Sequence, residues 1–229
     1  MKVFLVGGTG KLGRHVWRQA LAQRHTVTAF VRDASKLLGD AAAGGALPAG
    51  LEVVAGDAMD ADAMGAAAAG HDAVVSTLSQ VGDGPDLYQM TRELVTATGA
   101  AGITRLIVTA GGGALSRRTP DGPLMFEHEI FRSNPPLYAT QRQHIANLAM
   151  LYTQPPTLEW TMVCAPMMIG TDDEMEPTGN VVTTENIATR WGTSTYADAA
   201  SVIVGELECR GNIHTRVGVA TPPADTPKL

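Results

Sequence analysis

Residues 3–16, VFLVGGTGKLGRHV, decide the fold of this chain. Four apolar residues lead into a cluster of glycines, and a stretch with the apolar spacing of a helix follows. Gly7, Gly10 and Gly13 have the spacing G-x-x-G-x-x-G. Such glycines let the backbone turn sharply and let a phosphate approach, and the positive end of the following helix attracts that phosphate. The stretch therefore predicts a turn that binds a dinucleotide.

A loop of the nucleoside-triphosphate type is excluded at this position. That loop needs a glycine at a fixed distance ahead of a Gly-Lys pair, and a serine or threonine directly after the lysine. Around Gly10 and Lys11, the first glycine position holds Leu5 and the residue after the lysine is Leu12.

Beyond this turn, β-rich segments alternate with helical stretches. Strands are expected at residues 3–6, 26–31, 51–55, 73–77, 106–109, 160–164 and 214–219. Helices are expected from about residue 11 and at 61–69, 87–101, 139–152 and 197–207, with capping residues at Asp86 and Thr195. This alternation predicts an α/β fold with a mainly parallel sheet and helices on both faces.

The alternation is interrupted by loops at residues 39–50, 111–136 and 167–190. The last two follow the carboxyl ends of late strands, where open parallel sheets bind their ligands. No segment reads as a linker, so we expect one domain over residues 1–229, with a substrate region built from loops 111–136 and 167–195.

Composition narrows the function. The chain has 229 residues, 45% of them hydrophobic, and a net charge of −6, which argues against a nucleic-acid partner. No apolar run approaches the ~20 residues of a membrane span, and no secretory signal precedes the first strand. The two cysteines, Cys164 and Cys209, read as small core residues of a cytoplasmic protein. The six histidines form no metal-ligand spacing, so no metal is expected.

The end of the second strand indicates which dinucleotide binds. NAD-binding turns place an acidic residue there for the ribose 2′-hydroxyl, whereas an arginine accommodates the 2′-phosphate of NADP. Here the sequence reads FVRDASKL, with Arg32 at that position, Asp33 next and Lys36 one turn later. This pattern favours NADP(H) over NAD(H), although Asp33 can also be read as the acid, and Arg32 and Lys36 as solvated charges.

With these motifs in place, the chain resembles the atypical short-chain dehydrogenase/reductases of the NAD(P)H-binding, NmrA-like kind, and among them the biliverdin reductase B/flavin reductase type. The resemblance rests on VFLVGGTGKLGRHV, FVRDASKL, VVAGDAMDADAM, GHDAVVSTLS and LEWTMVCAP, in that order along the chain. It implies a doubly wound Rossmann fold with a seven-stranded sheet.

The resemblance also implies a cofactor site. Gly7, Thr9, Gly10, Lys11, Leu12 and Gly13 would wrap the pyrophosphate, and Arg32 would meet the 2′-phosphate. Asp57 and Ala58 would lie beside the adenine, and Thr77, Leu78 and Ser79 beside the ribose next to the nicotinamide. Ala110, Gly111 and the segment 164–167, with Pro166, would frame the nicotinamide.

The chain departs from the usual short-chain dehydrogenase pattern where that pattern carries the catalytic pair Tyr-x-x-x-Lys. Tyr138 is followed by Arg142 instead of lysine, and the two cations are not interchangeable. The serine position falls in TAGGG, where only Thr109 has a hydroxyl. His144 fits the helix histidine of the flavin-reductase type, as a proton donor or acceptor-orienting group, or else it is a surface histidine of an amphipathic helix.

Two features of the late loops leave the substrate open. Met162, Met167, Met168 and Met175 could line a pocket for a flat ligand or fill the core. Trp191 could cover a ligand or the edge of the sheet.

Two functions are therefore expected as alternatives. The first is an NADPH-dependent oxidoreductase that transfers hydride to a flat conjugated small molecule such as a flavin or quinone, with Tyr138, Arg142 and His144 as candidate catalytic residues. The second is a non-catalytic NADP(H) sensor of the NmrA type. In either case a monomer or small homo-oligomer is expected.

Overall fold

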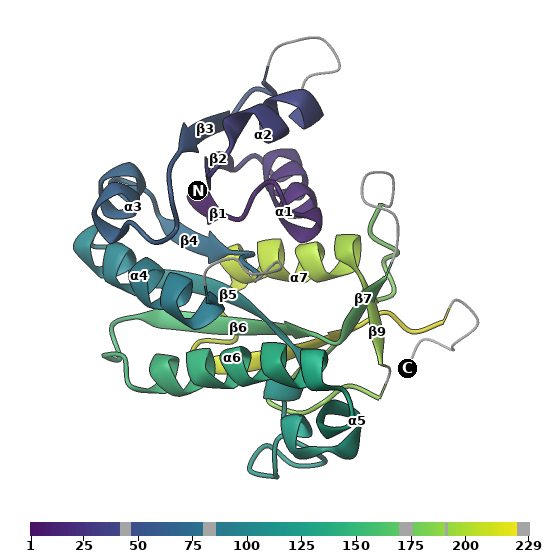
Figure 1. The fold of residues 1–229 in the computed structure, drawn as a ribbon. Helices are drawn as coiled ribbons and strands as arrows, with labels where there is room; N and C mark the ends of the chain where they lie inside the picture. Colours follow the sequence, from purple (N-terminus) through teal and green to yellow (C-terminus); the bar gives the residue numbers. More distant parts are fainter. Residues whose placement is uncertain (42–46, 80–85, 170–175, 191, 224–229) are drawn as a thin grey trace. The chain divides into compact units, whose positions relative to one another are not determined.

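The computed structural model describes residues 1–41, 47–79, 86–169, 176–190 and 192–223, without the side chains of 38–41 and 167–169. These residues form two compact units. The first contains Met1–Ile107 and Pro155–Glu159, and the second contains Val108–Gln154 and Trp160–Leu229. Figure 1 shows the elements of both.

The first unit is built on parallel strands. These are β1 (Lys2–Val6), β2 (Thr26–Val31), β3 (Leu51–Ala55), β4 (Ala73–Ser76) and the start of β5 (Arg105–Gly111), in the order β3-β2-β1-β4-β5. In the register, Val3 of β1 lies opposite Val27 of β2 and Ala73 of β4. The carboxyl ends of β1 to β4 lie at one edge of the sheet because their pairings are parallel.

Helices cover both faces of these strands. They are α1 (Lys11–Ala22), α2 (Ala34–Ala41), α3 (Ala61–Ala68) and α4 (Leu87–Ala100). The chain moves outward from β1 through β2 to β3, then crosses back past β1 to β4. Right-handed crossovers therefore place α1 and α2 on one face and α3 and α4 on the other. In Figure 1, α3 and α4 lie side by side.

Helix α2 was not expected from the sequence, and it occupies part of the predicted loop 39–50. Its start is set by Asp33, whose Oδ1 accepts hydrogen bonds from the backbone N–H of Ser35 at 3.0 Å and from its hydroxyl. The expected cap at Asp86 is confirmed, because its Oδ1 accepts the N–H of Tyr88 at 2.7 Å.

The second unit contains the end of β5, then β6 (Glu159–Ala165), β10 (Thr215–Ala220) and β8 (Val182–Glu185), in that order. Strand β10 is parallel to β6, whereas β8 is antiparallel to β10. Two short strands, β7 (Met167–Ile169) and β9 (Thr193–Thr195), pair separately. The strand count of seven is therefore wrong: β8 adds an eighth strand because the outer edge of β10 would otherwise be left unpaired.

The predicted loop at 111–136 is also largely structured. It contains the short helices η1 (Gly112–Ala114), η2 (Met125–Glu127) and α5 (Glu129–Arg132), and the start of α6 (Pro135–Tyr152). Helix α6 begins before the expected residue 139 because Asn134 caps it and prolines are tolerated in a first turn. The last helix, α7 (Tyr196–Cys209), begins with the expected cap, since Thr195 Oγ1 accepts the N–H of Asp198 at 3.0 Å.

The order β3-β2-β1-β4-β5-β6 is that of the doubly wound Rossmann fold, so the predicted fold class is confirmed. Figure 1 shows α6 and α7 on opposite sides of β6 and β10 in the second unit. Cys164 is buried as expected, but Cys209 is exposed at the end of α7 and is not a core residue. Among the described residues, no helix is long and apolar enough to cross a bilayer.

Candidate functional site

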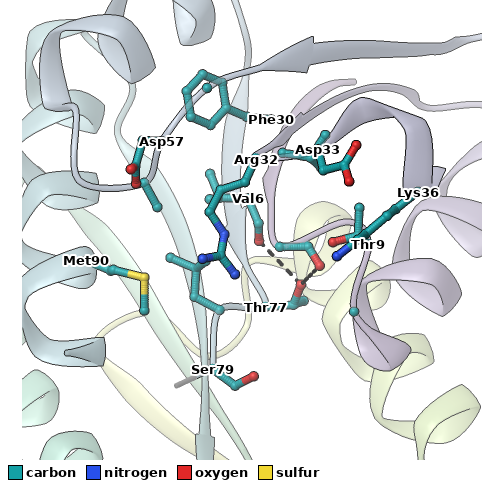
Figure 2. A pocket seen from close by; sticks show the side chains of 16 residues that line it. Val6, Thr9, Phe30, Arg32, Asp33, Lys36, Asp57, Thr77, Ser79 and Met90 are labelled. Carbon is teal, nitrogen blue, oxygen red and sulfur yellow. Dashed lines mark hydrogen bonds between the residues drawn. The ribbon is translucent and has the colours of Figure 1, made fainter. Parts of the chain in front are cut away.

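A cavity of about 400 Å³ opens at the carboxyl ends of β1 to β4 in the first unit (Figure 2). This is the edge at which open parallel sheets bind ligands. The lining comes from the turns after all four strands and from α2 and α4. Its residues are Val6, Gly7, Thr9, Gly10, Phe30, Val31, Arg32, Asp33, Lys36, Gly56, Asp57, Ala58, Thr77, Leu78, Ser79 and Met90.

The glycine turn is packed too closely for a side chain at Gly7 and at Gly13. Gly7 has φ +94°, and a Cβ there would lie 2.8 Å from the carbonyl carbon of Thr77. A Cβ at Gly13 would lie 2.8 Å from Gly8 Cα and would also collide with the Gly7 carbonyl. The Thr77 hydroxyl donates to the carbonyls of Val6 at 3.3 Å and Gly7 at 3.1 Å, which ties the end of β4 to the turn (Figure 2).

The start of α1 presents backbone groups to the cavity. Gly10 is its N-cap and provides no side-chain cap, and the Gly10 N–H donates to Gly7 O at 3.0 Å. A Cβ at Gly10 would have only that carbonyl within 4 Å, at 3.4 Å, so the space in front of Gly10 is open. An open, uncapped helix N-terminus fits the phosphate of a dinucleotide.

The charged residues in the cavity also fit a phosphate. In Figure 2 the guanidinium of Arg32 extends into the cavity, with Met90 on one side and Thr9 on the other. In the described part of the chain this guanidinium has no hydrogen-bond or ion-pair partner. The hydroxyl and backbone N–H of Ser35 lower the pKa of Asp33 by hydrogen bonding. Asp33 therefore stabilises the start of α2, and Arg32 and Lys36 are the cations that line the cavity.

Phe30 and Met90 form an apolar wall of the cavity, which the sequence analysis did not predict. The Phe30 ring lies against Gly56, where a Cβ would come within 2.5 Å of Phe30 Cε2. Met90 of α4 lies across the cavity (Figure 2). Asp57 is exposed and its Oδ1 accepts the Met59 N–H at 3.0 Å, which closes the turn after β3. An apolar wall of this kind suits a planar base.

The cavity brings together most of the cofactor residues expected in the first unit. Lys11, Leu12 and Gly13 are the exceptions: Lys11 is exposed, Leu12 is in the core, and Gly13 is buried beneath the turn. Several lining residues were not expected as cofactor contacts. They are Val6, Phe30, Val31, Gly56 and Met90, whereas Lys36 belonged to the expected NADP(H) pattern and Asp33 to its alternative reading as the NAD-type acid.

The remaining expected cofactor residues lie in the second unit. Ala110 is buried, whereas Gly111, at the end of β5, and Pro166, after β6, are partly exposed. A Cβ at Gly112 would contact Pro166 Cα at 3.4 Å, so the ends of β5 and β6 lie against each other.

The three candidate catalytic residues occupy different environments on α6. The Tyr138 ring stacks on Phe126, with ring centroids 4.5 Å apart and 17° between the planes. Arg142 is exposed. His144 is buried, with 9% of its surface exposed, and its Nδ1 has no hydrogen-bond partner in the described residues. Burial lowers the pKa of His144 to about 4, so the ring is neutral near pH 7.

This burial predicts how His144 affects stability. Its pKa is about 4 when folded and 6.5 ordinarily, so the unfolded chain binds the proton first as the pH falls. The free energy of unfolding should therefore decrease between pH 6.5 and pH 4, by about 2 kcal/mol at pH 5 from this group. His144→Leu should lose that part of the pH dependence in urea unfolding at pH 7 and pH 5. An unchanged pH dependence in the variant would contradict the neutral, buried ring.

The two expected substrate loops are held together by a buried cation. Arg216 of β10 is 6% exposed, and its guanidinium donates to Ala114 O at 2.8 Å and to Asn186 Oδ1 at 3.2 Å. Ser116 adds backbone hydrogen bonds to Asn186 and Ala188, each at 2.9 Å. These segments therefore form a fixed structure within the second unit.

Some expected residues cannot be assigned a place. Trp191 and Met175 lie outside the described residues, as do the side chains of Met167 and Met168. Met162 is a core residue, with 0% of its surface exposed. In the described part of the chain, no group of histidine, cysteine and acidic side chains could hold a metal ion.

Comparison with known proteins agrees with this geometry. The profile of a family described as NAD(P)H-binding matches residues 7–210. An NAD(P)H azoreductase from Xenophilus azovorans is 33% identical over 122 residues, a match that spans 53% of this chain and 38% of the azoreductase. The chain thus covers well under half the length of that relative.

Solved structures share the fold at low sequence identity. An anaerobillin reductase from Escherichia coli O157:H7 has a TM-score of 0.75 and 20% identity, with 100% of both chains covered. A Streptococcus pneumoniae protein assigned as an NADH-flavin reductase has a TM-score of 0.74 and 22% identity, with 97% of this chain and 100% of that chain covered.

Proposed function

Because the chain belongs to the NAD(P)H-binding family, we propose that it is an NADPH-dependent reductase that transfers hydride to a flat conjugated small molecule. The observation that carries the cofactor choice is the Arg32 guanidinium in the cavity beside the glycine turn, which has no partner among the residues that the structure describes. A cation there stabilises a 2′-phosphate, which NAD(H) lacks.

The proposed class of electron acceptor rests on the candidate catalytic side chains of α6. Arg142 is exposed, the Tyr138 ring is held by its stack on Phe126, and His144 is neutral. These residues support a reaction in which the nicotinamide supplies the hydride and the protein supplies binding and orientation. The names of the azoreductase relative and the flavin and anaerobillin reductases point to flat conjugated acceptors. We place the reaction in the cytoplasm, in a monomer or small homo-oligomer.

In the proposed reaction, the residues of the protein bind the dinucleotide and align it. The turn at Gly7 and Gly10 positions the pyrophosphate, and Arg32 binds the 2′-phosphate. Thr77 fixes the turn through its two hydrogen bonds to backbone carbonyls. The apolar wall at Phe30 and Met90 orders the adenine and keeps water from it.

Tyr138→Phe tests whether α6 supplies the proton. The phenylalanine keeps the stack on Phe126 and removes only the hydroxyl, so kcat should stay within about 3-fold of the wild type. General acid catalysis contributes ~10²–10⁴-fold, so a loss of that size would restore Tyr138 as the proton donor. The measurement is steady-state oxidation of NADPH with the best acceptor.

The function itself is tested with a panel of acceptors. Purified protein is mixed with NADPH and, one at a time, FMN, a quinone, a linear tetrapyrrole, an azo dye and an aliphatic aldehyde, and the absorbance of reduced nicotinamide is followed. We expect many turnovers with at least one flat acceptor and none with the aldehyde. Binding of NADPH without oxidation by any flat acceptor would overturn the reductase proposal in favour of a sensor.

A further inference from the structure

A polar side chain from another element, Gln141 of α6, lies against the glycine segment at the end of β5. Residues 110–113 read Ala-Gly-Gly-Gly and provide no polar side chain of their own. Gln141 of α6 fills the space above them. A Cβ at Gly111 would lie 2.7 Å from Gln141 Oε1, and one at Gly113 would lie 2.5 Å from the same atom. A side chain at Gly111 or Gly113 would therefore displace this carboxamide.

The orientation of the carboxamide is fixed by one hydrogen bond. The backbone N–H of Gly113 donates to Gln141 Oε1 at 3.1 Å. A backbone N–H can meet only the oxygen of an amide, so Nε2 points the other way, over Gly111. Gln141 is 5% exposed, and in the described residues its Nε2 has no hydrogen-bond partner. Nε2 is not among the fully buried polar atoms without a partner, so this N–H₂ group reaches the surface of the second unit, where it can donate to a ligand.

The position of Gln141 at the ends of β5 and β6 indicates what kind of ligand its Nε2–H can meet. Gly111 is the last residue of β5, and Pro166 follows the end of β6 beside Gly112. Ligands of this fold bind outside the carboxyl ends of such strands. Gln141 is one helical turn from His144, which shares the buried face of α6 and offers no charge near pH 7. The carboxamide is therefore the fixed neutral donor at this edge of the second unit.

We propose that Gln141 is a specificity-determining residue whose Nε2–H donates a hydrogen bond to a carbonyl oxygen or unprotonated nitrogen of the electron acceptor. This inference rests on the proposed reductase function. Flavins, quinones and azo compounds all carry such an atom next to the position that accepts hydride. Transfer of the hydride increases the negative charge on that atom, so the hydrogen bond strengthens as the reaction proceeds.

Two variants separate donation from simple packing. Gln141→Glu keeps the shape of the side chain and an oxygen for Gly113 N–H, but once ionised its carboxylate cannot donate. Because burial raises the pKa of a carboxyl above its ordinary ~4.3, the variants are compared at about pH 9. Gln141→Met keeps most of the volume and loses both hydrogen bonds. If Gln141 only holds the glycine segment, the glutamate variant should behave as the wild type and the methionine variant should fail.

The readout is kcat/KM for the best flat acceptor, together with the Kd for NADPH and the thermal midpoint. We expect both variants to lose about 10-fold or more in kcat/KM, the cost of one hydrogen bond in a buried site. NADPH affinity should change less than about 2-fold, because its tight contacts lie in the first unit. The glutamate variant should recover activity as the pH falls and its carboxyl binds a proton, whereas the wild type should not.

A glutamate variant with wild-type kcat/KM at about pH 9, or an equal loss in NADPH affinity, would overturn the role of Gln141. That result is distinct from failure of the proposed function, in which the wild type itself oxidises no NADPH with any acceptor.

Discussion

Gly10→Val should abolish dinucleotide binding and leave the protein folded. Gly10 is exposed, lines the cavity and has an ordinary φ of −74°. A Cβ there meets only Gly7 O, at 3.4 Å, so the valine methyl groups project into the space that the pyrophosphate needs. Loss of two charge-assisted hydrogen bonds to phosphate predicts roughly 100-fold weaker NADPH binding or more. The measurement is quenching or enhancement of nicotinamide fluorescence on titration.

The controls for this variant are two other glycines. Gly99→Ala on α4 has nothing within 4 Å of its new Cβ and should bind NADPH as the wild type does. Gly13→Ala should lose stability as well as binding, because its Cβ would collide with the Gly7 carbonyl. For Gly10→Val the thermal midpoint should stay within about 2 °C of the wild type. Unchanged NADPH affinity in this variant would show that the turn does not hold the pyrophosphate.

Arg32→Ala should reverse the cofactor preference. The variant loses the one guanidinium shown extending into the cavity, and with it the charge-assisted hydrogen bonds to a 2′-phosphate (Figure 2). NADPH affinity should fall about 10- to 100-fold, whereas NADH affinity should change less than about 2-fold. Raising the salt concentration should weaken NADPH binding to the wild type more than to the variant, because an exposed ion pair is screened.

A matched control removes the same charge elsewhere in the first unit. Arg92 on α4 is exposed, pairs with Glu93 at 2.7 Å and does not line the cavity. Arg92→Ala should leave both affinities unchanged. Arg32→Lys should recover part of the NADPH affinity, since an ammonium keeps the charge but not the planar pair of donors. Equal losses of NADPH and NADH in Arg32→Ala would contradict the assignment of the 2′-phosphate.

The features of the molecule that were predictable from the sequence depend on local chemistry. The strand, glycines and helix of residues 3–16 specify the turn because each residue type has a steric role within a few positions. The caps at Asp86 and Thr195 are local in the same way. Arg32 was found because its position relative to the end of β2 is fixed by the fold.

The parts that the sequence did not show depend on contacts between distant segments. Strand β8 has no apolar run of its own and forms because the edge of β10 needs a partner. Phe30 reads as an ordinary strand residue, and only the closeness of Gly56 turns its ring into a wall of the cavity. Gln141 lies between Tyr138 and Arg142 in the sequence, where nothing marks it as a site residue. Only the packing of α6 on the end of β5 brings its carboxamide to the glycine segment.

A crystal structure of the protein grown with NADP⁺ would show directly whether the cavity of the first unit binds the dinucleotide. We expect the pyrophosphate at the N-terminus of α1 over Gly10, the adenine against Phe30 and Met90, and the 2′-phosphate within hydrogen-bonding distance of the Arg32 guanidinium. A dinucleotide bound outside this cavity, or one whose 2′-phosphate points away from Arg32 into solvent, would contradict the account.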